Sequence, residues 1–446
     1  MEDLGLPSVF RVGAFAAWAV TAAHRQAAAF LAARTGIETV PEVSVGVREA
    51  AIAFRSERYL RENGEAAFEW APLSGDYRAA DGWVRLHCNF DHHAEIACRV
   101  LGVPPDREAV AAAVRRRGRF DIEDAIAEAG GVAAAMRTRE EWLAHGQSGA
   151  VGEQPLVAMT PSAGGATFAG VCGAGGTADA VASAEPAAGG AAGSATRPLA
   201  GIRVLDLTRI IAGPNAGRVL AAYGADVTMV RSPSLPTIRG LDLDLNFGKA
   251  LRFLDLRGGA GRAAFLDLVR GADVVLQSYR PGALAGLGLG AAELAAVNPR
   301  LVHVSISAYG AEGPWGGRRG FDSLVQMAVG IADEGMRAAG ADRPLPLPAQ
   351  VLDHGAGWLA AAGAVEALNR GGGLAVDVSL AGVAAALDGF GRVDPAVGLA
   401  VPDPRMADIE DLLLRTASGA GTLTHVRFPG RVAGAEFGWG GPPPIV

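Results

Sequence analysis

The second half of the chain repeats one pattern, a short apolar strand followed by a helix, and this pattern restricts the fold more than any other feature. The strand segments are 203–207, 225–230, 272–277 and 301–310, and the helices between them follow Pro214 or cover 261–270 and 291–296. Because these strands are apolar throughout, both faces of their sheet should be covered. Strands that alternate with helices favour a parallel sheet. We therefore predict an α/β fold with a Rossmann-like, doubly wound parallel sheet.

The first half has a different pattern and precedes a stretch without large apolar side chains. Residues 164–197 are mostly Gly, Ala, Ser and Pro, a composition typical of a flexible linker. Before it come an Ala-rich helix at about 12–34, a hairpin-like segment at 83–90 and amphipathic helices up to about 146. This mixture predicts a smaller α+β unit. The predicted domains are 1–160, a linker at 161–197, and 198–446.

Composition restricts the location and the partners of the protein. The 446 residues carry a net charge of −7, which gives no reason to expect a nucleic-acid partner. The apolar run 12–20 is too short to span a membrane, and the N-terminus lacks a basic signal-peptide region. Cys88, Cys98 and Cys172 have no regular spacing, which favours a reducing cytoplasm over a disulfide framework.

Neither a dinucleotide nor a metal is expected. The segment LTRIIAGPNAGRVLAAYGADV follows the first strand and lacks G-x-G-x-x-G, so NAD and FAD are disfavoured. The helix that begins near Pro214 can offer free N–H groups to a phosphate, although a plain strand–helix turn fits equally well. His87, Cys88, Asp91, His92 and His93 are of metal-ligating types but lack the usual ligand spacing, so their role stays open.

Seven segments of the second half occur in an order that resembles one enzyme family. They are PLAGIRVLDLTRIIAGP, NFGKALRFLDLR, ADVVLQSYRPGALAGLGLG, NPRLVHVSISAYGAEGPW, RRGFDSLVQMAVG, LDHGAGWLAAAGAVEAL and VDVSLAGVAAAL. Together they resemble the family III CoA-transferases, the CaiB/BaiF group, which includes formyl-CoA, carnitine and bile-acid CoA-transferases and 2-methylacyl-CoA racemases. The resemblance covers about 198–390. It implies the family's large domain, coenzyme A as part of an acyl-CoA substrate, and a free carboxylic acid as the second substrate.

The resemblance implies that Asp353, in LPAQVLDHGAG, is the nucleophile. A carboxylate that attacks a thioester gives a mixed anhydride and then an aspartyl-CoA, which keeps the acyl group activated. Gly355 and Gly357 should leave room beside Asp353 for the thioester, and their N–H groups can stabilise an oxyanion. Without the resemblance, an Asp before a helix is more often an N-cap.

The resemblance also assigns CoA contacts position by position. The residues are Ile211, Ala212, Leu254, Asp255, Leu256, Arg257, Ser278, Tyr279, Arg280, Arg319, Gly320, Phe321 and Asp322. Arg257, Arg280 and Arg319 are the predicted phosphate ligands, since guanidinium groups bind phosphate bidentately. The alternative for each is a solvated surface charge.

Phe321 favours a transferase over a racemase. The racemases resemble a G-H-D pattern where this chain has Gly320, Phe321 and Asp322, and a phenyl ring cannot move a proton. His354 adjoins Asp353 in sequence instead of facing it, whereas Gln326 matches the transferase pattern. Two alternatives remain, a racemase-like acyl-CoA isomerase and a non-catalytic relative that binds CoA thioesters.

The chain departs from the family in the order of its parts. PLSGDYRAADGWVRLHCNFDHHAEIACRVLGV and RTREEWLAHGQSGAVGEQPLVAM resemble the family's small domain, yet both precede the large domain. The small-residue helix near the N-terminus, its Gly turn and the Val-rich segment VSVGVREAA, expected to be a strand, echo residues 354–387. We interpret the chain as two partial family copies in which only Asp353 is retained as nucleophile, because its counterpart in the first copy lies near Arg11.

Two further departures concern the substrate and the assembly. FEWAPLSGDY stands where formyl-CoA enzymes have a Gly-rich loop, which favours an acyl group bulkier than formate or oxalate. Arg231 follows the second strand, where the family usually has Glu. Relatives form interlocked homodimers, so this chain is expected either to form a homodimer or to close on itself.

Overall fold

The computed structural model describes residues 4–67, 70–162 and 196–446. The predicted linker at 161–197 therefore lies almost entirely outside the described residues. Cys172 lies outside them too. Within the described part of the chain, no helix combines the length and the apolar character needed to cross a membrane.

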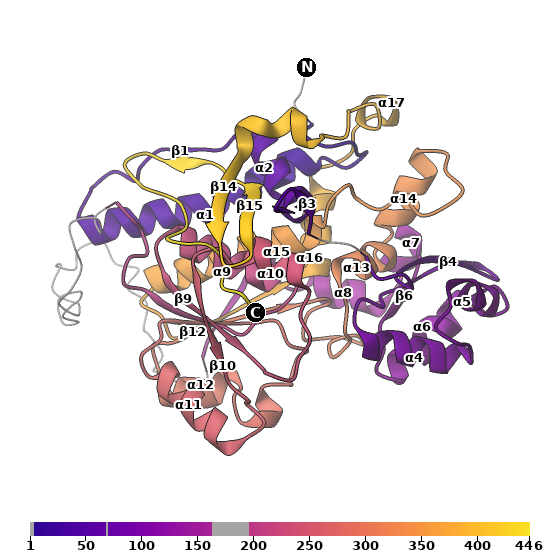
Figure 1. Cartoon of the computed structure of the whole chain (residues 1–446), viewed down its shortest axis with the longest axis horizontal. Helices are drawn as coiled ribbons and strands as arrows, with labels where there is room; N and C mark the ends of the chain where they lie inside the picture. Colours follow the sequence, from indigo (N-terminus) through magenta and orange to yellow (C-terminus); the bar gives the residue numbers. More distant parts are fainter. Residues whose placement is uncertain (1–3, 68–69, 163–195) are drawn as a thin grey trace.

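A seven-stranded sheet forms the centre of the large unit (Figure 1). Its strands, from one edge to the other, are β10 (Lys249–Phe253), β9 (Asp226–Arg231), β8 (Arg203–Asp206), β11 (Val274–Gln277), β12 (Val302–Ser307), β13 (Leu374–Ser379) and β7 (Ala158–Pro161). The first six are parallel, and β7 is antiparallel to β13. In chain order the parallel strands run third, second, first, fourth, fifth, sixth, so the order reverses between β8 and β11. Ligands of doubly wound sheets bind at the carboxyl ends of the strands beside such a reversal.

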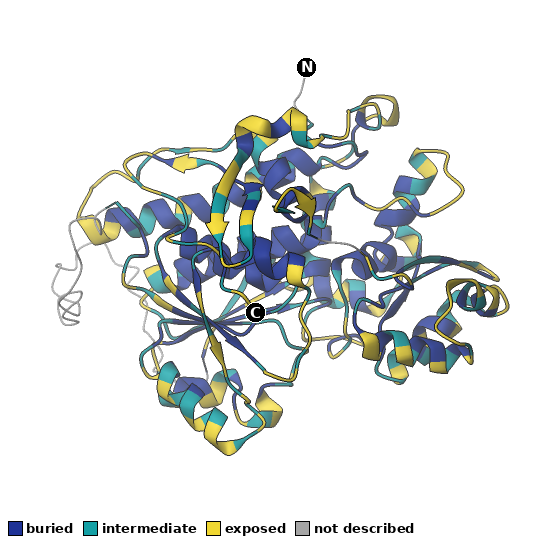
Figure 2. Ribbon diagram, viewed as in Figure 1, coloured by how far each residue is buried: buried dark blue, intermediate teal, exposed yellow. Residues whose placement is uncertain are grey.

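Helices cover both faces of the sheet, which confirms the predicted doubly wound α/β fold (Figure 1). On one face lie α1 (Val12–Thr35), α9 (Ala212–Ala222) and α15 (Val351–Asn369), and on the other lie α11 (Gly259–Val269) and α12 (Ala291–Val297). Figure 2 shows that α15 is buried along most of its length. A helix that is apolar or small all round suits such a central position.

Small residues of α15 bring its neighbours close. A Cβ at Gly355 would lie 2.8 Å from the Phe15 ring, and one at Gly357 would lie 2.6 Å from the Ala212 carbonyl oxygen. The expectation that these glycines clear a path for a thioester is therefore wrong, because they face α1 and α9. Glycine is required here for helix packing.

The smaller α+β unit lies beside the large one (Figure 1). It contains an antiparallel sheet of β4 (Gly75–Ala79), β5 (Gly82–Leu86) and β6 (Ala133–Ala135), with α4 (Asp91–Leu101), α5 (Arg107–Val114) and α6 (Arg119–Glu128). Its apolar core, which includes Val84, Ile122 and Ile126, is separate from the core around α15.

The remaining α-helices and strands come from both halves of the chain. They are β1 (Val43–Ser44), α2 (Val47–Ala53), α3 (Ser56–Tyr59), β2 (Arg61–Glu62), β3 (Glu65–Ala66), α7 (Arg139–Leu143), α8 (Gly146–Gly152), α10 (Arg239–Leu245), α13 (Asp322–Ala328), α14 (Ile331–Ala338), α16 (Leu380–Gly389), α17 (Pro395–Gly398), β14 (Leu413–Ser418), β15 (Gly421–Val426) and β16 (Arg431–Val432). One small sheet joins β14 and β15 to β2 and β3, and another pairs β1 with β16.

The prediction of a strand throughout VSVGVREAA is wrong, because only Val43 and Ser44 form one. β1 ends at Ser44, and α2 begins at Val47. Glu49 accepts a 2.8 Å hydrogen bond from the Gly46 N–H, which stabilises the helix start. Ala50, Ala51 and Ile52 are then buried, so tertiary packing outweighs the β propensity of the valines.

Candidate active site

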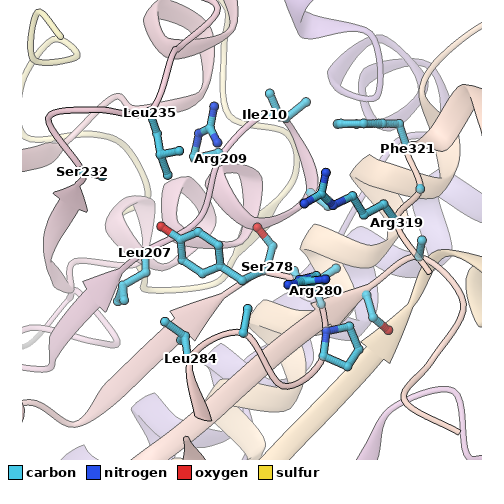
Figure 3. Close-up of a pocket in the computed structure, with 18 of the residues that line it drawn as sticks. Leu207, Arg209, Ile210, Ser232, Leu235, Ser278, Arg280, Leu284, Arg319 and Phe321 are labelled. Carbon is cyan, nitrogen blue, oxygen red and sulfur yellow. The ribbon is translucent and has the colours of Figure 1, made fainter. Parts of the chain in front are cut away.

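A cavity of about 530 Å³ lies at the carboxyl ends of the parallel strands (Figure 3). We call it the main cavity. Leu207 follows β8, Ser232 follows β9, Leu254 follows β10 and Ser278 follows β11, and all four line it. The cavity thus lies beside the reversal in strand order, where this type of sheet places its ligands.

The structure brings together nearly all of the predicted site residues. Those that line the main cavity are Ile211, Ala212, Leu254, Asp255, Leu256, Arg257, Ser278, Tyr279, Arg280, Arg319, Gly320, Phe321 and Asp353. Asp322 does not line it and borders a neighbouring cavity instead. The predicted residues come from five separated segments, and the parallel sheet brings the three that follow β8, β10 and β11 to one edge.

Six arginines surround the main cavity, and three of them were not predicted. Figure 3 shows Arg209, Arg280 and Arg319 among the lining side chains. Arg319 donates a 2.8 Å hydrogen bond to the Gly130 carbonyl, and Arg209 donates to the Pro236 carbonyl. Among the described residues, the side chains of Arg257 and Arg280 form no hydrogen bond. These two guanidinium groups are therefore the ones that an anion can engage without breaking an existing contact.

The other two unpredicted arginines are Arg231 and Arg318, and both contact other residues of the protein. Arg231 is buried, lies 2.8 Å from the Asp242 carboxylate and donates a 2.6 Å hydrogen bond to the Thr208 carbonyl. Arg318 lies over the Trp315 ring at 4.3 Å. The family usually has Glu after the second strand. This chain has Arg231 there, and Asp242 supplies the carboxylate that pairs with it.

Asp353 lies in the first turn of α15, whose N-cap is Gln350, so it is not itself the N-cap. The Asp322 carboxylate accepts hydrogen bonds from the N–H groups of Leu352 at 2.7 Å and of Asp353 at 3.0 Å. The side chain of Gln326 also donates to Asp322. Asp322 therefore caps α15 from outside the helix and fixes the backbone that carries Asp353.

Burial controls the charge of these two carboxyl groups. It raises the pKa of Asp322 to about 6, although the hydrogen bonds that Asp322 accepts oppose the shift. Burial also raises the pKa of Asp353 well above its ordinary value, and the negative charges of Asp322 and Glu57 add to this effect. The Asp353 carboxylate receives no hydrogen bond from the described residues, so it is a desolvated and strongly basic carboxylate when ionised.

Glu57 was not predicted, and it holds the histidine that follows Asp353. The Glu57 Oε2 and His354 Nε2 atoms lie 3.0 Å apart, and both side chains are buried. Burial alone would raise the pKa of Glu57, but the hydrogen bond and charge of His354 outweigh burial and lower it. This contact occupies the Nε2 atom of His354.

His87 stacks on Phe321. Their ring centroids lie 3.9 Å apart and the planes differ by 7°. Burial, followed by the charges of Arg85 and His93, lowers the pKa of His87 to about 3, so the imidazole is neutral. Neither ring nitrogen has a hydrogen-bond partner among the described residues. His87 thus places a polar imidazole beside Phe321, and the sequence motifs did not predict it there.

Two histidines near His87 in sequence also reach the main cavity. His92 and His93 line the main cavity with Phe90. Across the described ranges, no group of three or more His, Cys, Asp or Glu side chains has the arrangement of a metal site. Sequence motifs could not place these residues, because they reach the cavity from the smaller unit.

Comparison with known proteins gives one family. The model of CoA-transferase family III matches residues 10–160 and 199–403, two ranges separated by the predicted linker. The chain is 37% identical over 195 residues to an acetyl-coenzyme A transferase of Hypoxylon pulicicidum, covering 42% of this chain and 33% of that protein. It is 35% identical over 185 residues to a probable fatty acyl-CoA transferase of Mycobacterium tuberculosis, covering 39% of this chain and 46% of that protein. The chain thus spans between a third and a half of the length of these curated relatives.

One further relative and one solved structure are also similar to the chain. A formyl-CoA:oxalate CoA-transferase of Streptomyces avermitilis is 33% identical over 202 residues, covering 42% of this chain and 48% of that protein. A crystal structure of the Mycobacterium tuberculosis protein superimposes with a TM-score of 0.47 and 26% identity, covering 56% of this chain and 96% of that one.

Proposed function

The chain belongs to CoA-transferase family III, and we propose that it moves CoA from an acyl-CoA thioester to a free carboxylic acid through a covalent adduct on Asp353. One observation carries the proposal. Asp353 is buried, lacks a hydrogen-bond donor to its carboxylate among the described residues, and borders the cavity that the strand ends build. Relatives named as CoA-transferases support the same reaction class.

The reaction would proceed in four displacements. An Asp353 oxygen attacks the thioester carbonyl, the C–S bond breaks, and a mixed anhydride and CoA thiolate form. The thiolate attacks the Asp353 carbonyl, which releases the donor acid and leaves an aspartyl-CoA thioester. The acceptor carboxylate then attacks this thioester and releases the thiolate. The thiolate finally attacks the acceptor's carbonyl in the second anhydride and regenerates Asp353.

Residues around Asp353 would orient it and exclude water. Asp322 fixes the backbone at Leu352 and Asp353, and Phe321 with His87 forms an aromatic wall. Water must be kept out because an anhydride hydrolyses. A low local dielectric also strengthens the attack of a desolvated carboxylate.

Trapping tests the covalent step. The protein is incubated with acetyl-CoA and hydroxylamine, or with borohydride, and then digested for mass spectrometry. We expect a hydroxamate, or a reduced side chain, at Asp353 in the peptide that contains α15. An unmodified Asp353 during measurable CoA exchange would refute the adduct, and Asp267 on the surface serves as the internal control carboxylate.

Arg257 and Arg280 are the proposed phosphate ligands of CoA. Arg280→Gln should weaken CoA binding roughly ten- to hundredfold, since a hydrogen bond to a charged group contributes about 1.5–3 kcal/mol. Titration calorimetry with CoA at two salt concentrations measures the change. Arg270→Gln, at the exposed C-cap of α11, is the matched control and should bind CoA like the unchanged protein. Equal affinities of the two variants would contradict this assignment.

A racemase-like isomerase is the second candidate, and His87 is the observation that favours it. The imidazole stacks on Phe321, and both residues border a cavity with Asp353. An acid–base pair on one cavity is what a 1,1-proton transfer requires. Deuterium wash-in at the α-carbon of a 2-methylacyl-CoA would support this reading. A non-catalytic relative would show neither wash-in nor trapping.

The assembly and location stay predictions. We propose that residues 1–160 and 198–446 act as two partial family copies, that the chain works in the cytoplasm without metal, NAD or FAD, and that a solution mass measurement distinguishes a homodimer from a monomer.

A further inference from the structure

A second cavity, of about 370 Å³, adjoins the main cavity at Asp353. We call it the acid cavity. Its lining residues are Glu57, Arg58, Trp70, His87, Asn89, Ile210, Ile211, Ile238, Leu241, Phe321, Asp322, Gln350 and Asp353. Ile210, Ile211, Phe321 and Asp353 line both cavities, so the carboxylate lies at their junction. The volume is in the lower range of small-molecule pockets, which suits a short acid.

Much of the lining of the acid cavity is apolar. Of its carboxyl groups, Glu57 and Asp322 already have partners, and Asp353 is the proposed nucleophile. Ile238, Leu241 and Phe321 offer surface to a methylene chain. Glu57 contacts His354, and Asp322 caps α15. An incoming anion would be repelled by these groups unless a cation or a hydrogen-bond donor compensates.

Arg58 is the only cation among the described residues that line the acid cavity. Its guanidinium group forms no hydrogen bond with the described residues. Glu57 and Asp403 are the acidic groups that act on it. Glu57 contacts His354, and Asp403 is paired with Arg55, so neither has to be displaced for Arg58 to bind a carboxylate.

His87 supplies the second polar group. It is 4% exposed, and both of its nitrogens lack a partner among the described residues. A buried imidazole without a partner costs free energy. A bound acid that accepts a hydrogen bond from its N–H would remove that cost.

We propose that the acid cavity binds the acceptor acid and that Arg58 binds a second carboxylate on it, so that the preferred acceptors are short dicarboxylic acids. This inference rests on the proposed CoA-transferase function. His87 acts as a positioning residue that donates a hydrogen bond to the acid, whether or not the acid carries a second carboxylate.

Matched acceptors test the inference. Transfer from acetyl-CoA to succinate and to butyrate, and to glutarate and valerate, is followed by mass spectrometry of the acyl-CoA products. We expect the protein to favour the dicarboxylic acid of each pair. Arg58→Gln should lower the succinate-to-butyrate ratio of kcat/KM roughly ten- to hundredfold, because the lost contact is charge-assisted. Arg58→Lys should restore part of that ratio.

Two controls separate the roles. His87→Phe keeps the aromatic stack and should lower kcat/KM for both acids by roughly two- to tenfold, with an unchanged ratio, as expected for one neutral hydrogen bond. Arg116→Gln, exposed on the surface of the smaller unit, should leave the ratio unchanged.

The outcomes distinguish this inference from the proposed function. Transfer to acids without a dicarboxylate preference, or an unchanged ratio in Arg58→Gln, overturns the role of Arg58 and leaves Asp353 chemistry intact. Absence of transfer to every acid, together with an unlabelled Asp353, overturns both.

Discussion

Asp353→Asn is expected to abolish CoA transfer and, at the same time, to stabilise the fold. Replacing a nucleophile should lower kcat by about a thousandfold or more. The stabilisation follows from burial, because Asp353 is 7% exposed and Asp322 and Glu57 add negative charge around it. The amide is nearly isosteric and carries no charge. Relief of a strained functional position commonly adds about 0.5–2 kcal/mol to the free energy of unfolding.

The pH dependence of this gain has a definite sign. The pKa of Asp353 is raised in the folded protein, so the folded state favours the protonated form. The cost of the buried charge is therefore fully present above the folded pKa and disappears as pH falls toward the ordinary value of Asp. Denaturant unfolding should show a larger difference between Asp353→Asn and the unchanged protein at pH 8 than at pH 5.

The exposed carboxylate of Asp267 provides the control. Asp267→Asn should change the unfolding free energy by less than about 0.5 kcal/mol at either pH. CoA should still bind Asp353→Asn in titration calorimetry, since the predicted phosphate ligands are untouched. Retained transfer in this variant, confirmed free of deamidation by mass spectrometry, would refute the mechanism.

The sheet was predictable because its signal is local. Segments such as 203–207 and 272–277 are short and mostly apolar, and their alternation with helices favours buried parallel strands. The residues that line the main cavity were predicted from the family resemblance instead, and parallel strands bring the ends of several of their segments to one edge. Leu254, Ser278 and Ile211 therefore line one cavity although they are distant in sequence.

Glu57, Arg58 and His87 could not be predicted in this way. They reach Asp353 only because α3 and the smaller unit pack against the large unit. No periodicity or motif encodes the position of one unit on another. The role of Gly355 was mistaken for a related reason, because a glycine beside a reactive group and a glycine at a helix crossing look the same in sequence.

Lys249 is the only lysine of the chain, and its position explains why it is not an arginine. Its ammonium group is fully buried and lies 2.7 Å from Asp206 Oδ2, 2.8 Å from the Pro214 carbonyl and 2.9 Å from Asn246 Oδ1. Three acceptors around one point satisfy the three donors of an ammonium, whereas a planar guanidinium does not fit them. Burial lowers the pKa of Lys249 to about 8 against the opposing pull of Asp206, so the group stays mostly protonated at neutral pH.

The ion pair of Lys249 and Asp206 connects three elements beside the main cavity, β8, β10 and α9. Asp206 ends β8 and accepts a 2.8 Å hydrogen bond from the Thr208 N–H, Lys249 begins β10, and Pro214 lies in the first turns of α9. A Cβ at Gly217 would lie 2.4 Å from Asp206 Oδ2, so α9 closes over the pair. The loop that carries Ile211 is thus held from both sides.

Lys249→Met should destabilise the protein by about 3–5 kcal/mol, because it leaves Asp206 buried without a counter-charge. Denaturant unfolding measures this loss. Lys249→Arg should also destabilise, since a planar guanidinium does not match the three acceptors around the ammonium. The double variant Lys249→Met with Asp206→Asn should recover part of the loss, because the uncompensated charge is then gone and the Asn oxygen can still accept from Thr208. Arg270→Met breaks an exposed pair with Asp267 and should cost less than about 1 kcal/mol. Similar losses for Lys249→Met and Arg270→Met would show that burial does not set the strength of the Lys249 pair.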